Sequence, residues 1–159
     1  MAELEPATFR IDRVPAEVTY PLRQRVLRAG RPLPSAALAG DDNPVTGSFA
    51  ARDPSGEVVG TATIRLEPCP WRPDEPRAWR LRGMATAEEW RGQGVGAQLL
   101  RATIAHVALE GGGLIWCTAR TPARRFYERE GFMVEGDEWI DPEIGPHFEM
   151  WRPVELPLD

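Results

Sequence analysis

The sequence predicts an α/β fold, in which strands and helices alternate along the chain. A short alternating run at residues 79–85 is followed by a segment whose apolar residues recur at helical spacing, and a second apolar run follows at 114–117. A strand, a helix and a strand in this order form a right-handed crossover, which makes the two strands parallel. Further alternating runs before and after this unit extend the sheet.

The N-terminal part of the chain is predicted to contribute an edge strand and a helix. Residues 8–14 alternate in polarity, as strands do. The helix begins at Thr19 or Tyr20, because Pro21 is tolerated only in a first helical turn, and it ends at Gly30. Three arginines of this helix are expected on a solvated face: Arg23, Arg25 and Arg28.

A predicted loop leads from this helix into a β-hairpin. The loop, residues 31–46, is rich in Pro, Ala, Gly and Asp and has no clear period. The hairpin strands, 48–52 and 57–66, flank an Asp-Pro-Ser-Gly turn. A proline-rich stretch at 67–77 separates the hairpin from the strand at 79–85, which we expect to be central in the sheet.

The central strand is expected to alternate regularly, so that Arg82 and Met84 project toward the same side. Three glycines at 111–113 end the long helix that follows it, and 114–117 is a short buried strand.

The C-terminal part is predicted to begin with a helix and to end in strands. Thr121 caps this helix, Pro122 occupies its first position and Gly131 ends it. One strand begins at 132–134 and another spans 147–151.

Composition limits the function. A chain of 159 residues suits one domain, residues 1–159. The net charge is −5 and the nineteen basic residues are scattered arginines, which argues against nucleic acid as a partner.

The N-terminus is acidic and no apolar run is long enough to cross a bilayer, so we expect a soluble, cytoplasmic protein without a membrane partner. Cys69 and Cys117 have no metal-ligand spacing and are expected to be free thiols.

A glycine-rich loop precedes the long helix. Arg91, Gly94 and Gly96 fit the pattern R-x-x-G-x-G, whereas neither the Lys-Ser/Thr of a Walker loop nor the dinucleotide pattern G-x-G-x-x-G is present. Glycines let backbone N–H groups approach a polyanion closely, and a helix N-terminus adds a partial positive charge. The expected ligand of this loop is a pyrophosphate.

A second motif follows about thirty residues later, where residues 121–132 contain F-Y-x-x-x-G-F. Together the two motifs resemble the GCN5-related N-acetyltransferase (GNAT) superfamily. The resemblance implies a mixed, twisted sheet of about six to seven strands with helices on both faces, in which the central strand and the next parallel strand diverge.

The same resemblance implies acetyl-CoA as co-substrate and no metal. The implied acetyl-CoA contacts are backbone groups of Met84, Ala85 and Thr86 for the pantetheine arm, and of Arg91, Gly92, Gln93, Gly94, Val95 and Gly96 for the pyrophosphate.

Acetyl transfer from a thioester to an amine needs a base, an oxyanion donor and an acid. The resemblance assigns the acid to Tyr127 and the oxyanion donor to the backbone N–H of Met84. Many relatives carry a glutamate base in the central strand. The matching stretch here, residues 79–82, has no carboxylate.

A closer resemblance, to the glyphosate N-acetyltransferase subgroup, supplies a different base. It rests on the runs L-R-G-M-A-T, W-C-T-A-R-T, G-P-H and R-V-L-R. It implies His147 as base, and the substrate-binding residues it implies are Arg28, Arg82, Arg120 and His147. Two departures are that Thr118 stands where the subgroup has Asn and that the pyrophosphate loop follows the general superfamily pattern.

The expected activity is therefore acetyl transfer to the amine of a small molecule bearing carboxylate or phosphonate, by direct attack on the thioester, in a monomer or homodimer. Two alternatives remain open. The acceptor could be a polyamine, an aminoglycoside or a peptide N-terminus, or the protein could be an acyl-CoA sensor without turnover.

Overall fold

The computed structural model describes residues 8–27 and 40–156. Strands and helices alternate in the order that the sequence predicts. The strands are β1 (Arg10–Arg13), β2 (Gly47–Arg52), β3 (Val58–Leu66), β4 (Ala78–Thr86), β5 (Gly113–Arg120), β6 (Met133–Asp141) and β7 (Gly145–Val154). The α-helices are α1 (Tyr20–Leu27), α2 (Val95–Leu109) and α3 (Arg124–Arg129), and short 3₁₀ helices span Ala16–Thr19, Glu88–Trp90 and Thr121–Ala123. Among the described residues, no helix is both long and apolar enough to span a membrane.

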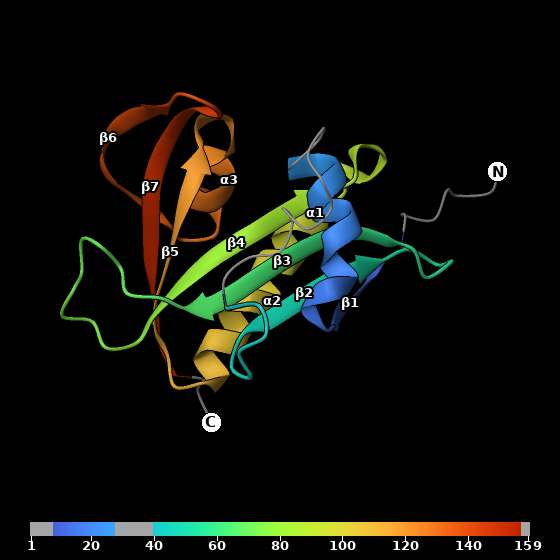
Figure 1. Cartoon of the computed structure of the whole chain (residues 1–159), viewed down its shortest axis with the longest axis horizontal. Coiled ribbons are helices and arrows are strands. Elements are labelled where there is room, and N and C mark those ends of the chain that lie inside the picture. The colour runs from blue at the N-terminus through green and yellow to red at the C-terminus, as the bar shows by residue number, and fades with distance from the viewer. Residues whose placement is uncertain (1–7, 28–39, 157–159) are drawn as a thin grey trace.

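The strands form one mixed sheet with the order β1-β2-β3-β4-β5-β7-β6. Among the described strands, only β4 and β5 are parallel, and the other neighbouring pairs are antiparallel. Helix α1 covers one face of the sheet, and α2 and α3 cover the other (Figure 1). The predicted α/β class, with helices on both faces, is confirmed.

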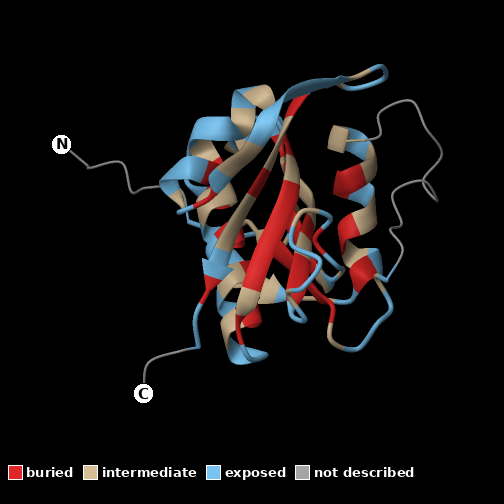
Figure 2. Cartoon of the chain, turned by 90° about the vertical axis from the view of Figure 1, so that its left-hand side faces the viewer, coloured by how far each residue is buried: buried red, intermediate tan, exposed pale blue. Residues whose placement is uncertain are grey.

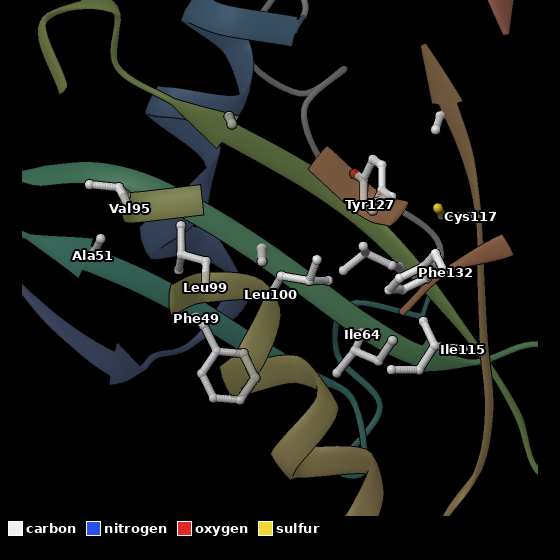
Figure 3. Close-up of a cluster of buried hydrophobic side chains, with 14 of the residues drawn as sticks. Phe49, Ala51, Ile64, Val95, Leu99, Leu100, Ile115, Cys117, Tyr127 and Phe132 are labelled. Atoms are coloured by element: carbon white, nitrogen blue, oxygen red, sulfur yellow. The ribbon is translucent and has the colours of Figure 1, made fainter. Parts of the chain in front are cut away.

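The main core lies between α2 and the sheet. Leu99 and Leu100 of α2 are fully buried and belong to the same cluster as Phe49, Ile64 and Ile115 of three strands (Figure 3). Each such side chain contributes roughly 1.5–3 kcal/mol by leaving water. Buried residues follow the central strands, whereas β6 at the edge is mostly exposed (Figure 2). The apolar face predicted for this helix therefore fixes it against the sheet.

The two parallel strands diverge part-way along their length. Their pairing extends from Ala78 and Leu114 to Arg80 and Trp116, although β4 continues to Thr86 and β5 to Arg120. Backbone pairing is therefore lost toward the carboxyl ends of both strands, which is where open α/β sheets bind ligands. The divergence that the superfamily resemblance implies is present.

Strand β4 contains a β-bulge, which the sequence did not predict. Thr61 and Thr63 of β3 lie opposite Ala85 and Arg82, so β4 carries one extra residue between these pairs. Gly83 has a φ of +66°, and a Cβ there would lie 2.8 Å from Nε of Arg23 in α1. Gly83 therefore lies on the same face of β4 as Arg82, and Met84 lies on the opposite face. The expectation that Arg82 and Met84 project together is wrong, because the bulge reverses the alternation.

Other local predictions need smaller corrections. Thr121 does not cap α3, because it begins a 3₁₀ turn and its hydroxyl donates to Glu138 Oε2 at 2.7 Å. Strand β5 is longer than the predicted 114–117 and includes Arg120. Gly131 follows α3 with a φ of +88°, as a helix-ending glycine does. The predicted helix end at Gly30 lies outside the described residues.

Candidate functional site

A cleft of about 1130 Å³ opens where β4 and β5 diverge. Its walls come from β4, β5, α1, α3, the loop before α2 and the β6–β7 hairpin. The predicted site residues that line it are Arg82, Met84, Ala85, Thr86, Arg91, Gly92, Gly94, Val95, Gly96, Arg120, Tyr127 and His147. Gln93 does not line the cleft, and Arg28 lies outside the described residues. Residues from five separate motifs thus meet in one place.

The loop before α2 presents backbone N–H groups at the cleft. In the described part of the chain, the N–H groups of residues 92–97 donate to no backbone carbonyl. Gly92 and Gly94 have φ values of +78° and +84°, and a Cβ at either position would meet no protein atom within 4 Å. The side chain of Gln93 turns back and donates to the Glu89 carbonyl at 3.1 Å. Unpaired N–H groups, a helix N-terminus and open space above two glycines suit a diphosphate.

Tyr127 lies on α3 beside β5. Its side chain is buried, and its ring makes edge contacts with the rings of Phe126 and Phe132, at 5.0 and 5.4 Å between centroids. Burial, with a smaller contribution from nearby Cys117, raises the pKa of Tyr127 well above 10 (Figure 3). The phenol therefore keeps its proton at neutral pH, so a proton is present there for a thiolate that forms in the cleft.

His147 lies on β7, directly opposite Arg120 of β5. The imidazole is buried, with 4% of the residue's surface exposed, yet it lines the cleft. Its Nδ1 lies 2.6 Å from the Gly145 carbonyl oxygen. Because a carbonyl only accepts, we assign the proton of the neutral ring to Nδ1, which leaves the Nε2 lone pair as an acceptor. This is the protonation state that a general base requires.

The two described arginines of the predicted substrate site come from different strands. Arg82 lies on β4 and is half-buried, and Arg120 is the exposed last residue of β5. Both line the cleft. Because β4 and β5 diverge there, the two arginines line the cleft from two different strands.

Sequence reasoning missed an ion pair in the wall of the cleft. Arg23, which was expected on a solvated face, is 1% exposed and lines the cleft. Its Nη1 donates to Asp41 Oδ2 at 2.8 Å, and its Nη2 contacts the Thr63 hydroxyl. Both charged side chains are almost fully buried, so removing one partner would leave a buried charge. Arg23 therefore supports the wall beneath the bulge at Gly83.

The β6–β7 hairpin contributes a second group of missed residues. Trp139, Asp141, Glu143 and Ile144 line the cleft beside His147. Their stretch is polar and irregular in sequence, so no period singled them out. They give the cleft two carboxylates in addition to its arginines.

A sequence profile of the acetyltransferase (GNAT) family matches residues 9–132, which include the loop, the diverging strands and Tyr127. The chain belongs to the GNAT family. This GNAT chain is 29% identical to YitI, an uncharacterized N-acetyltransferase of Bacillus subtilis, over 145 residues that cover 91% of the chain and 95% of YitI.

Solved structures of acetyltransferases have the same fold. A Corynebacterium glutamicum structure, described as histone acetyltransferase HPA2 and related acetyltransferase, is 25% identical, with a TM-score of 0.68 over 98% of this chain and 100% of that one. The ribosomal-protein-S18-alanine N-acetyltransferase of Escherichia coli has a TM-score of 0.73 at 17% identity, over 96% and 97% of the two chains, and shows the shared fold.

As a GNAT protein, the chain is an N-acetyltransferase that transfers an acetyl group to an amine, and acetyl-CoA is the donor that the family uses. Its residues fit this donor. The loop of residues 92–97 offers unpaired N–H groups for a diphosphate, and the gap between β4 and β5 offers a channel for an extended arm.

Replacing Gly94 with valine is expected to weaken acetyl-CoA binding by at least tenfold. A β-branched residue at a φ of +84° costs roughly 1–3 kcal/mol, and its side chain would occupy the space above the N–H groups. Gln93→Ala is the control, because that side chain points away from the cleft. Calorimetry with acetyl-CoA measures both variants, and equal affinity of wild type and Gly94→Val would remove the loop from the binding site.

Proposed function

We propose that this acetyltransferase acts on a small molecule whose amine is accompanied by a carboxylate or phosphonate. The observation that carries the proposal is the placement of Arg82 and Arg120 on the two diverging strands, in the same cleft as the N–H groups of the loop. Forked hydrogen bonds from guanidinium groups suit planar or tetrahedral anions. The resemblance of four motifs to glyphosate N-acetyltransferases supports the same substrate class, as would Arg28. A cytoplasmic location stays a prediction from the sequence.

The proposed reaction is direct attack of the amine nitrogen on the thioester carbonyl. Nε2 of His147 takes the proton that the nitrogen loses. The backbone N–H of Met84 stabilises the oxyanion, and the Tyr127 hydroxyl returns a proton to the departing thiolate. The carbon–nitrogen bond forms first and gives the tetrahedral oxyanion, and its collapse breaks the carbon–sulfur bond, so the products are an amide and a free thiol. His147 and Tyr127 lie on different elements, β7 and α3, and both line the cleft.

Asp141 and Glu143 refine the proposal. Two carboxylates beside His147 would attract an ammonium group, while Arg82 and Arg120 attract an anion. A zwitterionic acceptor carries charges complementary to both sets of side chains. The same carboxylates also favour the second candidate, a polyamine or another purely cationic acceptor.

An acceptor panel separates these candidates, with thiol release measured by a colorimetric reagent. We expect amino acids or aminophosphonates to be better substrates than their neutral amides and than polyamines. Arg82→Ala is expected to raise KM for the anionic acceptor by roughly tenfold or more, since a charge-assisted hydrogen bond contributes about 1.5–3 kcal/mol. Lysine at position 82 should rescue only partly, because an ammonium cannot form the planar fork.

Arg101→Ala is the matched control, because Arg101 lies outside the cleft and pairs with Glu130 on the surface. Its KM for the acceptor should stay at the wild-type value. If the amide or a polyamine is the better substrate, the anionic acceptor is wrong and the GNAT assignment remains. Acetyl-CoA binding without thiol release from any amine would favour the sensor.

A further inference from the structure

The imidazole of His147 is stacked against an indole. Trp139 of β6 lies opposite His147 in the antiparallel pair of β6 and β7. The ring centroids are 5.1 Å apart and the ring planes are inclined by 24°. Trp139 therefore covers one face of the ring that we propose as the base, and it restricts the directions in which Nε2 can point.

The indole is in turn fixed by a carboxylate. Trp139 Nε1 donates to Glu149 Oε1 at 3.1 Å, and the Thr118 hydroxyl donates to Glu149 Oε2 at 3.0 Å. Thr118 and Glu149 face each other across β5 and β7. Glu149 is two residues beyond His147 on β7 and therefore shares its face. A continuous set of contacts thus joins Thr118, Glu149, Trp139 and His147 across three strands.

The hydrogen-bonded ladder alone does not fix the indole. Strand β6 is at the edge of the sheet, and its register with β7 is irregular between Glu135 and Trp139. Trp139 itself is 38% exposed. The contact with Glu149 supplies the anchor that the irregular ladder lacks. Thr118, which departs from the subgroup's Asn, takes part in this anchor.

We propose that Trp139 and Glu149 are positioning residues for His147. Glu149 holds the indole, and the indole holds the imidazole with Nε2 toward the acceptor. The electron-rich face of the indole also stabilises the imidazolium that forms when Nε2 accepts a proton. The proposal rests on the proposed function, because it requires His147 to be the base.

Three variants test the proposal in the full-length protein with acetyl-CoA and the best acceptor of the panel. Trp139→Leu removes the stack and the hydrogen bond, Trp139→Phe keeps an aromatic face, and Glu149→Gln removes the charge of the anchor. We expect Trp139→Leu to lower kcat by about 10–100-fold, with KM for acetyl-CoA unchanged. The kcat of Trp139→Phe should be much closer to the wild-type value than that of Trp139→Leu. The kcat of Glu149→Gln should lie between those of Trp139→Phe and the wild type.

The pH–rate profile gives a readout that a merely structural role would not move. Without the indole face the imidazolium is less stable, so the acidic limb should shift toward lower pH by about half a unit in Trp139→Leu. The charged groups near His147 among the described residues are Arg120 on β5, the hairpin carboxylates Asp141 and Glu143, and Glu149 on β7. Both Trp139 variants retain all four, so they and not Glu149→Gln report the effect of the indole on the acidic limb. Trp139→Phe should keep the wild-type acidic limb.

Trp151→Leu is the matched control. Trp151 lies on the same strand pair, opposite Met133, but packs under Arg72 outside the cleft. It should leave the acidic limb and the KM for acetyl-CoA unchanged. If Trp139→Leu and Glu149→Gln keep the wild-type kcat and acidic limb while His147→Ala is inactive, the positioning role is wrong and the proposed base stands. If His147→Ala is fully active, the base itself is wrong.

Discussion

Replacing His147 with alanine is expected to lower kcat by about 10²–10⁴-fold and to leave acetyl-CoA affinity nearly unchanged. The imidazole donates Nδ1–H to the Gly145 carbonyl, so Nε2 is the atom that can accept a proton in the cleft. Alanine removes this acceptor without touching the loop at residues 92–97. Steady-state kinetics measures kcat, and calorimetry measures the affinity for acetyl-CoA.

His106 provides the matched control for this variant, because it is the second histidine of the chain. It is buried on α2, where Nε2 contacts the Val45 carbonyl oxygen at 2.9 Å and the ring packs on Phe49 and Trp79. His106→Gln should lower the melting temperature but retain kcat well below that temperature. Full activity of His147→Ala, with an unaltered acidic limb of the pH–rate profile, would assign His147 to packing.

Local sequence signals predicted the parts of the site that depend on neighbouring residues. The loop at residues 91–96 was found because its glycines and the apolar spacing of α2 lie within one short stretch. Tyr127 was found from a motif that includes its own helix and the helix-ending glycine. In both cases the backbone conformation that places the residue is set within a few positions of it.

The parts that were missed depend on pairing between distant residues. Gly83 looked like one more position of an alternating strand, and the bulge is visible only in the register of β4 with β3, in which Gly83 has no partner. Arg23 is buried because Asp41, eighteen residues further along, reaches its guanidinium. Trp139 joins the site through its register with β7. Sequence periodicity carries no information about such partners, since it reports only which face of an element is apolar.

Replacing Tyr127 with phenylalanine is expected to lower kcat by about 10²-fold or more, because the departing thiolate loses its proton donor. The effect should be chemical and not structural. The contacts described for Tyr127 are made by its ring, with Phe126 and Phe132, and phenylalanine keeps them. The free energy of unfolding at pH 7 should therefore change by less than about 1 kcal/mol. Denaturant titration at that pH checks this, alongside the kinetics.

The alkaline stability of the same variant tests the state of the phenol. Burial raises the pKa of Tyr127 well above 10, so the folded protein holds this proton where the unfolded chain releases it. Stability linked to Tyr127 is complete below about pH 10 and is lost as the pH rises from there toward the folded pKa. Tyr127→Phe removes this loss, and its stability should fall less steeply above pH 10 than that of the wild type, while the buried Cys117 thiol contributes equally to both. Identical alkaline unfolding curves would mean that the phenol is solvated, and unchanged kcat would exclude it as the acid.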